Sequence, residues 1–233
     1  MHQTFSLVRP FRRLAVLGLI VLFAGCLTIE ENYTFKKDGS GTMEYVVDMS
    51  AMAEFMKSLE KMGDGKADKE KKGLNGMEMS GTIDQLKTLP GIKKVRLKKE
   101  QDGYVQKVSF GFKDLAALNA ALNVLMPDST GARQEFFRWD GNTLVRTNNA
   151  HAMGVGRDMA SSEDGADSAS ALGILQSMQY KYSFAFANEV AGTEQVEGMV
   201  KESPDAKKVK LSTDWSVIMK DPKALDLRIT LNK

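Results

Sequence analysis

The chain has 233 residues, with 32 lysines and arginines against 30 aspartates and glutamates, one cysteine and two histidines. This near-neutral balance leaves no basic excess to neutralise phosphates, so nucleic acid is not an expected partner. One cysteine makes no intramolecular disulfide, and two histidines are too few for a zinc site built from several histidine or cysteine ligands.

The first 25 residues have the three-part layout of a secretory signal peptide. Residues 1–13 hold three arginines and no acid, and residues 14–25 are uncharged and end in small side chains. A permanent membrane anchor is the alternative, but twelve helical residues reach about 18 Å, short of the roughly 30 Å of bilayer hydrocarbon. We therefore expect residues 1–25 to be removed and residues 26–233 to form a single domain.

The cysteine follows this segment directly, and Phe23-Ala24-Gly25-Cys26 resembles the lipobox of bacterial lipoproteins. The resemblance implies that Phe23, Ala24 and Gly25 are recognition residues, and that the Cys26 sulfur is acylated and becomes the new N-terminus. Two or three acyl chains, at about 0.8 kcal/mol per buried CH2, would anchor the protein stably to a membrane. A free cysteine acting as a small hydrophobe is the alternative. The expected location is the bacterial cell envelope, and Leu27 in place of aspartate favours the outer membrane of a Gram-negative cell.

Three Asp-Gly pairs, each between two alternating segments, have the form of a tight hairpin turn. They are Asp38-Gly39, Asp102-Gly103 and Asp140-Gly141. Alternate residues from Ile29 to Phe35, Glu31 among them, share one face of the first predicted strand. Three such hairpins predict an antiparallel sheet.

Helices are predicted between the hairpins. The first runs from an N-cap at Ser50 to about residue 62, and the second covers residues 80–89. The clearest follows Asp114 as N-cap and ends before Pro127. Further strands are predicted at 180–186, at 207–217 with Trp215 near its end, and at 225–231.

Two polar stretches, residues 61–76 and 153–170, are predicted to be mobile loops because they contain few apolar side chains. Strand and hairpin patterns lie on both sides of the second stretch, so it does not divide the chain. The order of elements predicts an α+β fold: a curved antiparallel sheet built from Asp-Gly hairpins, with two or three helices packed on one face.

No catalytic motif is recognisable. His151 is the only histidine beyond the leader, and it lacks a neighbouring nucleophile motif, so we expect a solvent-exposed loop residue. Acidic residues near 163–167 lack the spacing of a calcium loop, and no motif selects a carboxylate pair for glycoside chemistry. The sequence therefore predicts a protein that is not an enzyme and needs no cofactor or metal.

Methionines and aromatic residues predict an apolar face. Seven of the 14 methionines lie between residues 43 and 79, where they would form core, a lipid-adaptable pocket or, least expected, a copper site. The strand at 180–186 carries four aromatic side chains on one face, which would fill a core or line a cavity. The residues expected to line a pocket are Met52, Phe55, Met56, Tyr180, Tyr182, Phe184 and Phe186.

The order of these features resembles the LppM-like family of bacterial lipoproteins and membrane-anchored domains. The resemblance rests on the lipobox, the DGSG hairpin, the hairpin-to-helix unit at 102–122, and the Trp215 segment before LDLRITL. It implies an α+β domain with a curved sheet around an apolar cavity, associated with envelope lipids. The predicted function is a non-enzymatic, membrane-anchored lipoprotein that binds a lipid or other apolar ligand. A scaffolding lipoprotein that docks protein partners, with residues 61–76 as a contact, is the alternative.

Overall fold

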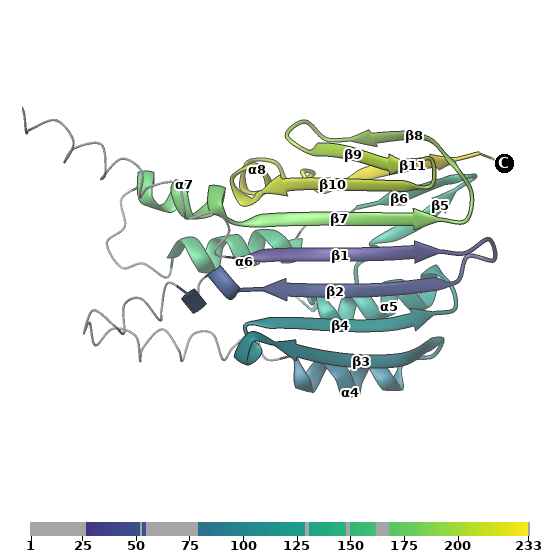
Figure 1. Ribbon diagram of the computed structural model, residues 1–233, viewed down its shortest axis with the longest axis horizontal. Helices are drawn as coiled ribbons and strands as arrows, with labels where there is room; N and C mark the ends of the chain where they lie inside the picture. The colour runs from purple at the N-terminus through teal and green to yellow at the C-terminus, as the bar shows by residue number, and fades with distance from the viewer. Residues whose placement is uncertain are drawn as a thin grey trace, which may run out of the picture.

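The computed structural model describes residues 27–51, 53–54, 79–128, 131–147, 150–161 and 168–232, and their strands form two sheets (Figure 1). The larger sheet contains, in spatial order, β3 (Ile92–Glu100), β4 (Val105–Phe112), β2 (Gly41–Asp48), β1 (Thr28–Phe35), β7 (Gln179–Phe186), β10 (Lys208–Asp214) and β9 (Val200–Asp205). The smaller sheet contains β5 (Phe137–Asp140), β6 (Thr143–Arg146), β11 (Leu227–Leu231) and β8 (Val190–Gln195).

All three predicted Asp-Gly hairpins are present, and they join β1 to β2, β3 to β4, and β5 to β6. Their glycines have positive φ, which a residue without a Cβ adopts without steric cost; these are Gly39, Gly103 and Gly141. One pairing differs from the prediction, because β7 runs parallel to β1 at the centre of the larger sheet. The other strand pairs of both sheets are antiparallel.

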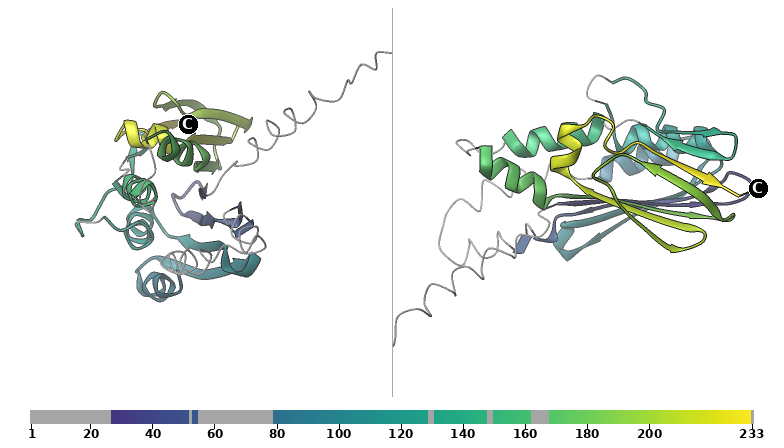
Figure 2. Two further views of the ribbon diagram at one scale, coloured as in Figure 1. Left: turned by 90° about the vertical axis from the view of Figure 1, so that its left-hand side faces the viewer. Right: turned by 90° about the horizontal axis from the view of Figure 1, so that it is seen from above.

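Helices and the smaller sheet cover the same face of the larger sheet, as the two views of Figure 2 show. The described α-helices are α4 (Ser80–Thr88), α5 (Leu115–Leu125), α6 (Ala150–Ser161), α7 (Ser168–Ser177) and α8 (Trp215–Lys220). The α+β prediction is confirmed, with more helices than the two or three expected. In α5 the predicted cap is confirmed: the Asp114 carboxylate accepts a hydrogen bond of 2.9 Å from the Ala117 N–H.

The loop prediction for residues 153–170 is wrong where the structure describes them, since α6 reaches Ser161 and α7 begins at Ser168. The sequence predicts a loop here because the segment has few apolar side chains, and its glycines also lower helix propensity. The reason for Gly156 is steric: a Cβ there would lie 2.6 Å from both Trp215 Cδ1 and Met219 Sδ. Packing against α8 therefore explains this glycine. The predicted loop at 61–76 and residues 162–167 lie outside the described residues.

Two further boundaries differ from the sequence prediction. Trp215 begins α8 instead of ending a strand, because the Asp214 carboxylate caps the helix by accepting bonds from the N–H groups of Ser216 (2.8 Å) and Val217 (3.3 Å). Ser50 is already helical and not the N-cap, and the rest of its predicted helix lies largely outside the described residues.

Candidate functional site

The predicted apolar pocket falls partly outside the structure and partly in its core. Met52, Phe55 and Met56, together with Phe23, Ala24, Gly25 and Cys26, lie outside the described residues. The four aromatic residues of β7 share one face, as predicted, and are buried; they are Tyr180, Tyr182, Phe184 and Phe186. Rings from neighbouring elements pack on this row, with Phe184 stacked 5.2 Å from Tyr33, and Phe186 stacked 5.5 Å from Phe35. The aromatic face is therefore core along most of β7.

Beside this row lies a buried ion pair that joins the two sheets. Arg146 on β6 approaches Glu31 on β1, with 3.0 Å between Nη2 and Oε1, and both side chains are fully buried. The hydroxyls of Tyr33 and Tyr180 donate to the two carboxylate oxygens of Glu31. The guanidinium also lies over the Tyr182 ring, 4.9 Å from its centre. Charge, hydrogen bonds and a cation–π contact thus offset much of the cost of burying the two charges.

Burial and the nearby charge shift the titration of this cluster. Burial first, and the Glu31 carboxylate second, raise the pKa of Tyr33 and Tyr180 well above 10. Burial alone would lower the pKa of Arg146, but Glu31 and the surrounding tyrosines outweigh it and raise the pKa. The tyrosines therefore stay neutral donors and the arginine stays charged at physiological pH.

The position of His151 differs from the predicted solvent-exposed loop. It lies in α6 and is half-buried, not exposed in a loop, and its Nε2 is 2.9 Å from the Tyr180 hydroxyl. Because that hydroxyl donates to Glu31, His151 Nε2 is the donor to Tyr180 and Nδ1 carries the lone pair. Burial and the Arg146 charge lower the pKa of His151 to about 3. The imidazole is thus the neutral end of a hydrogen-bond chain from α6 to β1.

This cluster was missed by the sequence analysis, although one signal was present. Glu31 occupies an otherwise apolar face of an alternating strand, which indicates a buried carboxylate with a partner. Its partner Arg146 is 115 residues away along the chain, so no local pattern links the two. Glu31 and Arg146 line neither of the two hollows described next. Their arrangement joins the sheets and holds α6 through the bond between Tyr180 and His151.

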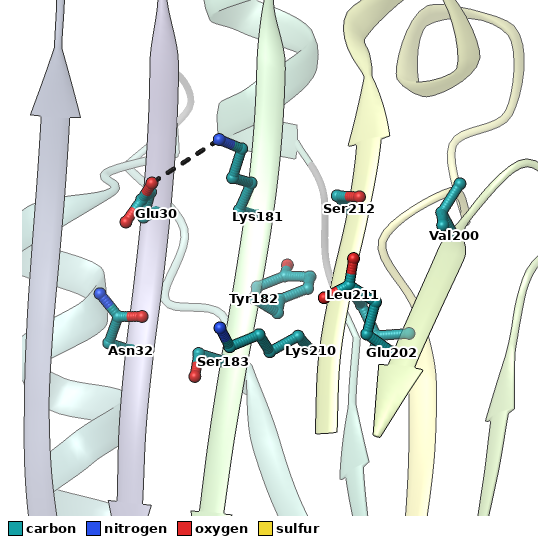
Figure 3. A pocket seen from close by; sticks show the side chains of 10 residues that line it. All are labelled: Glu30, Asn32, Lys181, Tyr182, Ser183, Val200, Glu202, Lys210, Leu211 and Ser212. Carbon is teal, nitrogen blue, oxygen red and sulfur yellow. Dashed lines mark ion pairs between the residues drawn. The ribbon is translucent and has the colours of Figure 1, made fainter. Parts of the chain in front are cut away.

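A groove of about 440 Å³ crosses the outer face of the larger sheet, opposite the helices (Figure 3). Its lining carries both signs of charge, and Glu30 on β1 lies 3.8 Å from Lys181 on β7. Lys210 on β10 and Glu202 on β9 continue the alternation. A surface of this kind suits water and polar groups, so it is not the predicted apolar pocket.

A second hollow, of about 280 Å³, lies where β1 and β7 end, and it has aromatic walls. We call it the aromatic hollow; it is lined by Phe35, Lys36, Lys37, Asp38, Gly39, Trp139, Phe186, Ala187, Asn188 and Leu231. Trp139 is 37% exposed, and its ring lies 6.2 Å from that of Phe35 in an edge-on arrangement. Of the predicted pocket residues that the structure describes, Phe186 lines this hollow and Tyr182 lines the polar groove.

The chain enters the fold at the opposite end of β1. Leu27 is fully buried in the core, and its carbonyl accepts a hydrogen bond of 2.9 Å from the N–H of Gln179, at the start of β7. The neighbouring pair, Thr28 and Gln179, opens the parallel ladder. The first strand therefore begins two residues after Cys26, at Thr28, as the early start of its alternating pattern predicted.

No family model matches the sequence, and no curated protein matches it. Among solved structures, the chain is similar to the folded domain of LppM from Mycobacterium tuberculosis, determined by NMR. The two are 13% identical, with 90% of this chain and 91% of that one covered, and the TM-score is 0.43. LppM gives its name to the family whose order of features the sequence resembles.

Within the described ranges, none of the helices is both long enough and apolar enough to cross a bilayer. In the same part of the chain, no three His, Cys, Asp or Glu side chains gather as metal ligands.

Proposed function

We propose that this chain is a lipid-anchored protein of the bacterial envelope that binds an apolar ligand and catalyses no reaction. The observation that carries the proposal is the course of β1. The strand starts one residue beyond Leu27, which adjoins the lipobox cysteine, and it ends at Phe35, in the wall of the aromatic hollow. One strand thus connects the expected anchor to the candidate binding site.

The burial of Leu27 supports a membrane-proximal domain. Because Leu27 is packed in the core, no flexible tether separates Cys26 from the fold. Acyl chains on Cys26 would therefore hold the end of the sheet where β1 starts against the bilayer. The eight residues of β1, at about 3.3 Å each, then place the aromatic hollow about 26 Å further from the membrane.

The chemistry of the aromatic hollow supports an apolar ligand with an anionic group. Trp139 supplies exposed aromatic surface beside the buried rings of Phe35 and Phe186. Lys36 and Lys37, with Asp38 next to them, leave one net positive charge at the rim. A volume of about 280 Å³ is at the small end of ligand sites, which span roughly 300–1,000 Å³. The hollow therefore suits a ring system or the end of an acyl chain, and it is too small to enclose a whole lipid.

Two measurements test this proposal. Intact mass of the mature protein should show loss of residues 1–25 and added acyl mass on Cys26; an unmodified thiol there would contradict the anchor. Anilinonaphthalene sulfonate, an apolar ring with one negative charge, should bind and protect Trp139 from iodide quenching. Trp215 is fully buried, so quenching reports on Trp139.

A pair of variants locates the bound probe. Trp139→Ala should weaken probe binding at least about tenfold, because it removes the exposed ring of the hollow. Val200→Ala is the matched control, since Val200 is an exposed apolar residue of β9 outside the hollow. Equal binding by Trp139→Ala would contradict the site. A protein that takes up no apolar probe, yet crosslinks to an envelope protein, would favour the scaffolding alternative.

A further inference from the structure

Helix α7 has an unusual composition for a surface helix. Its ten residues, Ser168–Ser177, contain no charged side chain, although 27% of the chain is charged. Leu172 is 41% exposed, and Gly173 beside it is also exposed. Among the described residues, only Trp139 and Val200 are other large apolar side chains with comparable exposure. Such an uncharged helix can lie against an apolar surface without removing any charge from water, which would be costly.

Helix α7 lies at the end of the fold where the chain enters β1. The helix ends at Ser177, and Gln179, two residues later, donates its N–H to the Leu27 carbonyl. Figures 1 and 2 show α7 at the end of the larger sheet where β1 starts, far from the tip of the β1–β2 hairpin. The chain that precedes the structure, with its lipobox cysteine, therefore reaches the fold beside this helix.

We propose that α7 lies on the bilayer surface and places Leu172 in the lipid interface. The inference rests on the anchor proposed above, because acyl chains on Cys26 leave the helix within reach of the membrane. The absence of a tether is the main argument: with Leu27 fixed in the core and bonded to Gln179, the bilayer surface cannot be far from the start of β7. The lack of charge on α7 lowers the cost of contact, and Ile174 and Leu175 pack its other face against the core, which fixes the helix in place.

A spin label can measure this contact in the mature acylated protein. Cys26 is the only cysteine, so once it is acylated an introduced cysteine is the sole reactive thiol. A nitroxide on Leu172→Cys would be compared with one on Lys37→Cys, at the hairpin tip on the other end of β1. Both proteins would be reconstituted in vesicles of phosphatidylethanolamine and phosphatidylglycerol. The readout is the collision rate of each label with oxygen, which enters lipid, and with a water-soluble nickel chelate.

The label at position 172 should lose access to nickel and gain access to oxygen on reconstitution, while the label at position 37 stays as accessible to nickel as in detergent. If the mass shows acylated Cys26 but both labels stay accessible to nickel, the membrane contact of α7 is contradicted and the proposed anchor is not. An unacylated Cys26, with both labels aqueous, would overturn the anchor and the contact together.

Discussion

Replacing Glu31 by glutamine should destabilise the fold strongly, because Arg146 would stay buried without its counter-charge. Both side chains are fully buried and lie 3.0 Å apart, so water cannot screen the remaining guanidinium. Removing one partner of such a pair costs about 3–5 kcal/mol in the free energy of unfolding. The amide also offers donors where the Tyr33 and Tyr180 hydroxyls need acceptors. For a domain of this size the expected fall in Tm is about 6–20 °C.

Urea unfolding followed by far-UV circular dichroism measures this loss. The double variant Glu31→Leu with Arg146→Met should recover part of it, because it removes both charges and leaves only tyrosine hydroxyls without a partner. Asp140→Asn is the matched control: its pair with Arg228 has a similar 2.9 Å separation but is exposed, so the cost should stay below about 1 kcal/mol. Equal, small losses in Glu31→Gln and Asp140→Asn would refute the reasoning.

Two further predictions concern His151 and a glycine. With its pKa lowered to about 3, His151 should stay neutral in the folded protein, and an imidazole NMR titration near 6.5 would contradict its placement. Since the unfolded histidine gains a proton near pH 6.5, stability should fall by about 1.4 kcal/mol per unit from there toward pH 3, and His151→Gln should lack this contribution. Gly41→Ala would place its Cβ 2.0 Å from the Thr34 carbonyl oxygen and should lower the free energy of unfolding by about 3 kcal/mol or more. Gly192→Ala is the control, because a Cβ there meets nothing within 4 Å and the variant should unfold like the wild type. Equal urea midpoints for the two variants would contradict this contrast.

The sequence predicts the local parts of the fold well. Asp-Gly turns between alternating segments identify three hairpins, because the turn geometry requires these residues whatever the rest of the chain does. The cap at Asp114 identifies α5 for the same reason. Alternation along 180–186 places four aromatic residues on one face, and the structure confirms their burial.

Features that depend on distant contacts could not be predicted. Gly156 reads as a helix breaker until Trp215 is known to lie against it. The parallel pairing of β1 with β7 joins segments separated by most of the chain, with no turn residue to mark it. The aromatic hollow needs Trp139 from one hairpin beside Phe35 from another. The sequence therefore names several members of the site without showing which of them meet.

The burial of Leu27 also constrains the order of events when the protein is made. An enzyme that modifies Cys26 and cuts before it would need the residues on both sides extended in its active site. In the folded domain Leu27 is packed in the core, and its carbonyl is bonded to Gln179, which is synthesised much later. Because β1 lacks β7 as a neighbour until then, the proposed modification of Cys26 would take place while Leu27 is still free of Gln179. Under the proposed lipidation, the late synthesis of β7 would let processing at Cys26 finish before β1 and β7 pair next to it.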